Sequence, residues 1–210
     1  KIVFFGTPHF AATNLNALIN AGYDIVGIVC PPDSKKGRGK QLKACAVKEV
    51  GTAHNIPVLQ PLKLRDIDFI HHLKSLNADI FVVVAFRMLP KTVWGLPRNG
   101  TINLHTSLLP NYRGAAPINW VLINGEKETG ITTFFIDQKI DSGVIILQEK
   151  IKLTDSTTAA ELHNNLMNKG SKLLINTLKS IKDNSVSQQK QEHNSEMSEA
   201  PKLTKDLLKI

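Results

Sequence analysis

The chain has 210 residues, of which 42% are hydrophobic and 21% charged, the balance of an ordinary globular protein with one large domain or a domain plus an appendage. Its net charge of +8 allows a polyanionic partner. Two cysteines exclude a disulfide framework and zinc-type spacing, and no apolar run reaches the ~20 residues of a membrane span. We therefore expect a cytoplasmic enzyme with no metal and no membrane partner.

Short apolar runs alternate with amphipathic stretches in the first 123 residues. This pattern is typical of βα units around a largely parallel sheet. In chain order, it predicts strands at 2–6, 24–30, 57–59, 80–85 and 101–105, and helices at about 8–22, 46–54, 67–76 and 117–123.

The pattern changes near residue 129. Two β-rich stretches, 129–136 and 143–153, follow each other with no helix between them, which predicts an antiparallel extension of the sheet. The longest helical pattern follows at 158–181, and the polar stretch 185–200 is expected to be a surface excursion or linker. The predicted fold class is therefore α/β: a Rossmann-like, mostly parallel sheet with helices on both faces and an antiparallel β extension.

The turn after the first predicted strand, Gly6-Thr7-Pro8, lacks the G-x-G-x-x-G of dinucleotide sites, and no P-loop pattern occurs. These absences argue against NAD or ATP as the main ligand. Such folds nevertheless bind ligands beyond the carboxyl ends of their strands.

Asn103 and His105 stand two residues apart on the strand predicted at 101–105, so their side chains share one face. An amide donor beside an imidazole suits acyl transfer. Read alone, such a pair is more often a polar strand face whose Asn and His are satisfied. Asp141, in the loop before Gly143, is a third candidate, although an isolated Asp there also suits a turn. Ser107 lacks a nucleophile-elbow context, so direct attack by a substrate amine is simpler than a covalent enzyme intermediate.

Five basic residues fall within nine positions with no acid among them: Lys35, Lys36, Arg38, Lys40 and Lys43. Two glycines interrupt the run and let its backbone approach a ligand closely. The segment is either a solvated basic loop or a contact for a polyanion.

These residues belong to a set of motifs that resembles the folate-dependent formyltransferases. The matching segments are Phe4–Pro8, Gly37–Lys40, Ile102–His105, Ser107–Pro110, Tyr112–Pro117, Glu128–Gly130 and Asp141–Gly143. The similarity extends to about residue 183 in the order of the family, and the basic Gly-Arg-Gly-Lys stretch points to members that act on tRNA.

The resemblance implies an enzyme that passes the formyl group of 10-formyltetrahydrofolate to the amino group of initiator methionyl-tRNA. We expect the protein to be monomeric. It implies Asn103, His105 and Asp141 as the catalytic residues. The pterin is expected against two segments, made of Phe86, Arg87, Met88 and Leu89 and of Ser107, Leu108, Leu109 and Pro110. The tRNA contacts implied are Arg38 and Lys40, with Lys35, Lys36 and Lys43 adding sequence-independent attraction.

Two alternatives stay open: formylation of a small amine, such as an amino sugar nucleotide or a purine precursor, and a non-catalytic RNA-binding module. The second leaves the catalytic candidates unexplained. For the domains, the resemblance implies a catalytic domain over 1–183. Residues 184–210 would form a polar segment and the start of a linker to an absent C-terminal OB-like domain.

Overall fold

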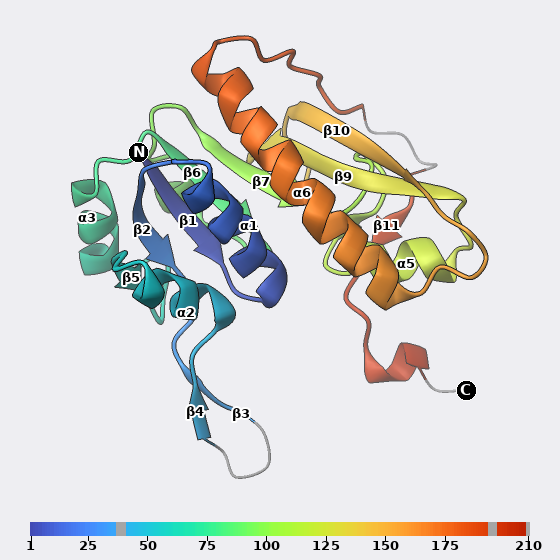
Figure 1. Cartoon of the computed structure of the whole chain (residues 1–210), viewed down its shortest axis with the longest axis horizontal. Coiled ribbons are helices and arrows are strands. Elements are labelled where there is room, and N and C mark those ends of the chain that lie inside the picture. Colours follow the sequence, from blue (N-terminus) through green and yellow to red (C-terminus); the bar gives the residue numbers. More distant parts are fainter. Residues whose placement is uncertain (37–40, 193–196, 209–210) are drawn as a thin grey trace. The chain divides into compact units, whose positions relative to one another are not determined.

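The computed structural model describes residues 1–36, 41–192 and 197–208, and it consists of two compact units, Lys1–Leu104 and His105–Ile210 (Figure 1). The division falls within one strand, β7 (Thr101–His105). Among the described residues, none of the helices combines the length and apolarity that a membrane crossing requires.

The first unit is built on parallel strands in the order β7-β6-β1-β2-β5. Their bounds are β1 (Ile2–Gly6), β2 (Ile25–Val29), β5 (Val58–Leu59), β6 (Ile80–Val84) and β7 (Thr101–His105). Every residue of β1 and β6 is buried, as expected for nearly continuous apolar runs at the centre of a parallel sheet.

Helices connect these strands: α1 (His9–Asn20), α2 (Ala46–Ala53), α3 (Ile67–Ser75) and the short α4 (Lys91–Trp94). The α1 helix buries Phe10, Leu15 and Leu18 and packs against α2 and the sheet. The α3 helix begins at Asp66, whose carboxylate accepts hydrogen bonds from two backbone N–H groups of the first turn. The α3 helix buries Phe69 and Leu73, so α1 and α3 each bury apolar side chains in the first unit.

The basic segment of the first unit is partly strand. Antiparallel strands β3 (Ser34–Lys36) and β4 (Gln41–Lys43) pair Ser34 with Lys43, and this hairpin extends beyond α2 in Figure 1. The sequence predicts only a loop here, because the pairing is made by the backbone and leaves no alternation of apolar residues. The predicted tRNA contacts Arg38 and Lys40 lie outside the described residues.

The second unit contains an antiparallel pair, β9 (Glu128–Phe135) and β10 (Ile145–Lys152), covered by the long helix α6 (Ala159–Lys182). The α6 helix begins with a capping box between Thr158 and Glu161. Hydroxyls of Thr133 on β9 and Thr177 on α6 are hydrogen-bonded at 2.7 Å. This buried polar contact fixes the helix on the strands.

Shorter elements complete the second unit: β8 (Arg113–Gly114), α5 (Pro117–Ile123), β11 (Glu199–Ala200) and a 3₁₀ turn at Lys205–Leu208. Strand β11 pairs with β8 in parallel, and Gln189 bridges to Ile145 on β10. The polar stretch after α6 therefore runs along the second unit and pairs with two of its segments.

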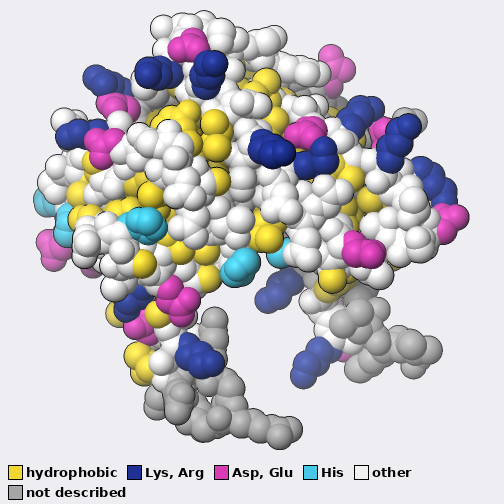
Figure 2. All heavy atoms as spheres, viewed as in Figure 1, with side chains coloured by type: hydrophobic (Ala, Val, Ile, Leu, Met, Phe, Trp, Pro, Cys, Tyr) yellow, Lys and Arg dark blue, Asp and Glu magenta, His cyan; other side chains and the backbone are white. Residues whose placement is uncertain are grey.

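The predicted α/β fold class, with a mostly parallel sheet, helices and antiparallel strands, is confirmed. Lysine and arginine side chains are interspersed with acidic ones on the face seen in Figure 2.

Candidate active site

His105 ends β7, and the residue is 7% exposed. Its Nε2 lies 2.8 Å from the backbone carbonyl oxygen of Tyr112. Because a carbonyl only accepts hydrogen bonds, Nε2 carries the proton and donates it. The lone pair of the neutral ring is then on Nδ1, which makes Nδ1 the nitrogen able to take up a proton.

Asp141 faces that nitrogen. Its Oδ2 lies 3.7 Å from Nδ1 of His105, and both side chains are largely buried. The same oxygen accepts a hydrogen bond of 2.9 Å from the backbone N–H of Gly114. The distance to Nδ1 is too long for a hydrogen bond but short enough for strong electrostatic attraction to a protonated ring. The second unit therefore brings together two of the three predicted catalytic residues.

The loop that presents Asp141 has tight backbone constraints. Asp141 itself has a φ of +48°, in the left-handed region that residues other than glycine rarely adopt. Asp137 accepts hydrogen bonds from Lys139 N at 3.0 Å and Ser142 Oγ at 2.7 Å. At Gly143, an added Cβ would lie 1.7 Å from the carbonyl oxygen of Phe135, so only glycine fits there.

Tyr112 supplies the carbonyl that fixes the His105 tautomer, and its own side chain is anchored. The phenol donates to the carboxylate of Glu126 and accepts from Asn124 Nδ2 at 3.1 Å. Burial, and then the Glu126 carboxylate, raise the pKa of this phenol, so it stays a donor at neutral pH. The sequence did not indicate Tyr112 as a site residue, because its contribution is a backbone carbonyl.

The predicted pterin segment Ser107–Pro110 is held by two side chains of the same unit. Thr132 donates to the carbonyl of Ser107 at 2.6 Å and accepts from the N–H of Leu109 at 3.2 Å, while Gln148 donates to the carbonyl of Leu109 at 2.8 Å. The side chain of Leu109 is buried against Phe134 and Ile145.

The residues of the Ser107–Pro110 segment differ in whether they are paired within the unit or exposed. The carbonyl of Ser107 and both backbone groups of Leu109 are paired within the unit, and the peptide bond before Pro110 is cis. Leu108 and Pro110 are partly exposed. They are the members that offer surface to a ligand.

The remaining predicted site residues lie in the first unit. Asn103 is partly exposed on β7, where it pairs with Val83 on β6. The guanidinium of Arg87 donates to the carbonyls of Pro61, at 2.7 Å, and Leu62, at 3.2 Å, and lies 5.8 Å from the ring centre of Phe86. Arg87 thus fixes the chain around it. Within the same predicted segment, Leu89 is buried and Met88 is exposed.

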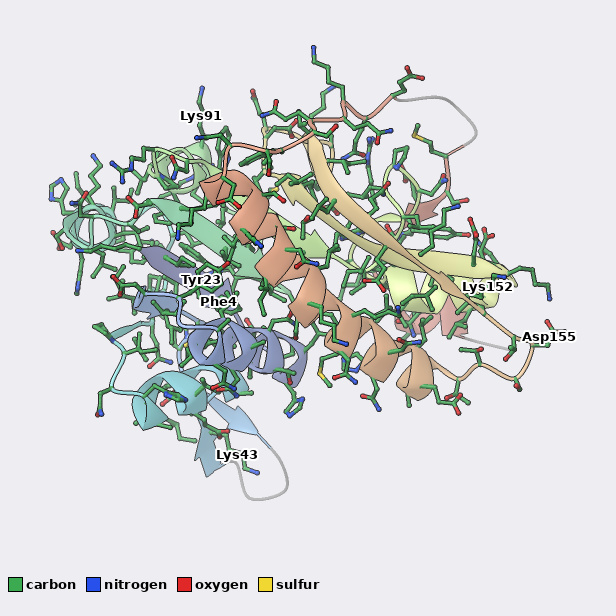
Figure 3. All side chains as sticks on the ribbon, turned by 45° about the horizontal axis from the view of Figure 1, so that its top comes forward. Phe4, Tyr23, Lys43, Lys91, Lys152 and Asp155 are labelled. Carbon is green, nitrogen blue, oxygen red and sulfur yellow. The ribbon has the colours of Figure 1, made fainter. Side chains whose placement is uncertain are left out.

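Of the predicted tRNA contacts, Lys35 and Lys36 belong to β3, and Lys43, labelled in Figure 3, is exposed on β4. The hairpin is tied to its own unit at its base. Asp33 accepts hydrogen bonds from Lys48 Nζ at 2.6 Å and Gln60 Nε2 at 2.8 Å. The hydrogen bond from Lys48 is the main cause that lowers the pKa of the Asp33 carboxyl. Among the described residues, no cluster of His, Cys, Asp and Glu is arranged to hold a metal ion.

Known proteins include a family that matches most of this chain and relatives that are similar to it. Residues 1–178 match the model of the formyl transferase family. The chain is 51% identical over its whole length to the methionyl-tRNA formyltransferase of Flavobacterium johnsoniae and covers 67% of that protein.

Solved structures agree in fold. The phosphoribosylglycinamide formyltransferase of Anaplasma phagocytophilum is similar with a TM-score of 0.75 at 19% identity, over 96% of this chain and 98% of that one. A sugar 3N-formyl transferase, solved in the presence of dTDP and 5-N-formyl-THF, is similar with a TM-score of 0.72 at 23% identity, over 98% of this chain and 70% of that one. From the extent of the family match and the identity to its curated relative, the chain belongs to the formyl transferase family.

Proposed function

We propose that this chain transfers the formyl group of 10-formyltetrahydrofolate to the amino group of methionyl-tRNA, the reaction that prepares initiator tRNA for translation. The observation that carries the proposal is the His105–Asp141 pair, with its tautomer fixed by Tyr112. The name of the 51% identical relative supports tRNA as the acceptor. The chain spans about two thirds of the length of that relative.

The tautomer of His105 determines which ring nitrogen accepts a proton in the proposed reaction. The amine attacks the formyl carbon, and the carbonyl oxygen gains negative charge as the tetrahedral intermediate forms. The side-chain amide of Asn103 donates a hydrogen bond to that oxygen. The amine proton passes to Nδ1 of His105, and the imidazolium is stabilised by the carboxylate of Asp141.

Collapse of the intermediate completes the transfer. The bond between the formyl carbon and N10 of the folate breaks, and N10 takes the proton from His105, so both protein groups return to their starting states. Every step uses a proton already present in the reactants, and the imidazole carries it from one nitrogen to the other.

The other contacts are proposals from the sequence. Phe86–Leu89 and Ser107–Pro110 contact the pterin, the latter through Leu108 and Pro110. The five basic residues 35–43 attract the phosphates of the tRNA acceptor end. We further propose that the protein is a cytoplasmic monomer.

The acceptor is the part of this proposal that an assay tests directly. Wild-type protein is mixed with 10-formyltetrahydrofolate and one of three acceptors: charged initiator tRNA, an amino sugar nucleotide or glycinamide ribonucleotide. Formylation of the charged tRNA well above that of both small amines supports the proposal. Transfer to a small amine and not to tRNA would show that the acceptor is wrong while the chemistry is right.

A further inference from the structure

The described residues of the polar stretch after α6 are fastened to the loops that hold His105 and Asp141. The backbone of Gln189 exchanges two hydrogen bonds with Ile145, of 2.9 and 3.1 Å. Farther along, the carbonyl of Ser198 accepts from the N–H of Tyr112 at 2.6 Å, and β11 pairs with β8. All these contacts lie within the second unit.

The side chain of Gln191, between those two anchor points, uses its whole hydrogen-bonding capacity. Its amide Nε2 donates to the carbonyls of Asp141, at 3.0 Å, and Gly143, at 2.7 Å. Its Oε1 accepts from Nε of Arg113, at 3.1 Å, and from Nη2 of the same guanidinium, at 2.6 Å. A primary amide has two donor hydrogens and one oxygen with two lone pairs, so each is satisfied.

The two segments that Gln191 joins are those that hold the catalytic pair. Arg113 stands between Tyr112, whose carbonyl accepts from His105, and Gly114, whose N–H donates to the Asp141 carboxylate. On the other side, Gln191 binds the backbone of Asp141 itself, at its left-handed φ of +48°. A strained backbone conformation of this kind persists only where its surroundings enforce it.

We propose that Gln191 is a positioning residue for formyl transfer, holding the Asp141 loop so that the carboxylate stays opposite Nδ1 of His105. The inference rests on the proposed function, because the pair that Gln191 positions is the proton-transfer pair of that reaction. It also gives the polar stretch after α6 a role that its composition does not suggest.

Three variants test the role of the amide. Gln191→Met keeps the length of the side chain and removes its hydrogen bonds. Gln191→Glu keeps an acceptor for Arg113 and removes the two donors to the loop carbonyls. Gln189→Ala is the matched control, because Gln189 is exposed and its hydrogen bonds to Ile145 are made by the backbone.

Formyl transfer kinetics and thermal stability are measured for all three. We expect both Gln191 variants to lose about tenfold to a hundredfold in kcat while KM for both substrates stays within about threefold of wild type. Values of kcat equal to the Gln189→Ala control would overturn the inference, as would a loss explained entirely by a smaller folded fraction. A Gln191→Glu variant with wild-type kcat would also overturn it, because the loop donors would then be dispensable. If Gln191→Met does not fold, the kcat of Gln191→Glu relative to the Gln189→Ala control tests the inference.

A second readout separates this inference from the proposed function. The ¹⁵N chemical shifts of the His105 ring, assigned with a His105→Gln variant, report the tautomer without any substrate. We expect them to change in Gln191→Met and to match wild type in Gln189→Ala. If wild type transfers no formyl group yet the shifts change as expected, the proposed function fails and the positioning stands. Unchanged shifts in Gln191→Met, with wild-type transfer intact, overturn the positioning alone.

Discussion

Oδ2 of Asp141 lies 3.7 Å from Nδ1 of His105, opposite the ring nitrogen that carries the lone pair. The carboxylate therefore gains most of its attraction to the ring after Nδ1 takes up a proton. We therefore expect Asp141 to act in the stage of the proposed reaction at which Nδ1 of His105 carries a proton.

Asp141→Asn is expected to lower kcat by about a hundredfold to ten-thousandfold, because the neutral amide does not stabilise the imidazolium. KM for 10-formyltetrahydrofolate should change little. Steady-state kinetics with charged tRNA measure both parameters. A variant with raised KM and unchanged kcat would instead place Asp141 in substrate binding.

Gly143→Ala is expected to disrupt the Asp141 loop, because the new methyl group would lie 1.7 Å from the carbonyl oxygen of Phe135. We expect a loss of about 1–3 kcal/mol in the free energy of unfolding and at least a tenfold loss of kcat, about the cost of misplacing a catalytic group. Urea unfolding and kinetics check these values.

Gly125→Ala provides the control for that substitution. Gly125 also has a positive φ, of +66°, but its Cβ position is open. This variant should lose some stability and retain kcat. Equal losses of kcat in the two variants would mean that the loop geometry at Gly143 has no special importance for turnover.

Thr132→Val is expected to loosen the Ser107–Pro110 segment, since the Thr132 hydroxyl bonds both Ser107 and Leu109. Unpaired buried groups should cost about 1–3 kcal/mol of stability, and KM for 10-formyltetrahydrofolate should rise. Thr133→Val is the matched control. It lies next along β9, is also fully buried, and bonds Thr177 on α6 instead. If Thr133→Val loses as much stability and also raises KM for 10-formyltetrahydrofolate, the rise in KM does not depend on the hydrogen bonds that Thr132 makes to the Ser107–Pro110 segment.

Asp33 gives the base of the basic hairpin a defined pH dependence. Its pKa is lowered in the folded state, chiefly by the hydrogen bond from Lys48. The stability it contributes is therefore fully present above the unfolded-state pKa, about 3.9, and is lost as pH falls through the lower folded-state value.

The unfolding free energies of wild type and Asp33→Asn, measured by urea titration from neutral to acid pH, should therefore converge as the pH falls below about 4. A difference that stays constant throughout this range would show that Asp33 does not contribute through its charge.

The sequence predicted most of the elements because apolar periodicity reports burial directly. The strand at 101–105 and the helix at 117–123 occur with the predicted bounds, as β7 and α5. Periodicity gave no sign of the β3–β4 hairpin or of β11, whose pairing depends on the backbone and not on buried side chains.

The residues of the candidate site also differ in how far the sequence predicts them. His105 and Asp141 are residue types with evident chemistry, so motifs and spacing point to them. Tyr112 and Gln191 act through a carbonyl and through contacts with distant loops. Such contacts exist only in the folded chain, so Tyr112 is predicted only as part of a matching motif, without a role, and Gln191 is not predicted at all.

The most direct test of proton transfer through His105 is single-turnover formyl transfer from 10-formyltetrahydrofolate to charged initiator tRNA by His105→Ala, with folate binding measured in parallel. His71→Ala, which removes an exposed imidazole from α3, is the control. If His105 carries the proton, the rate should fall by about a hundredfold or more while folate binding persists and the control matches wild type. A near-normal rate in His105→Ala would contradict proton transfer through His105 and remove the His105–Asp141 pair from the mechanism.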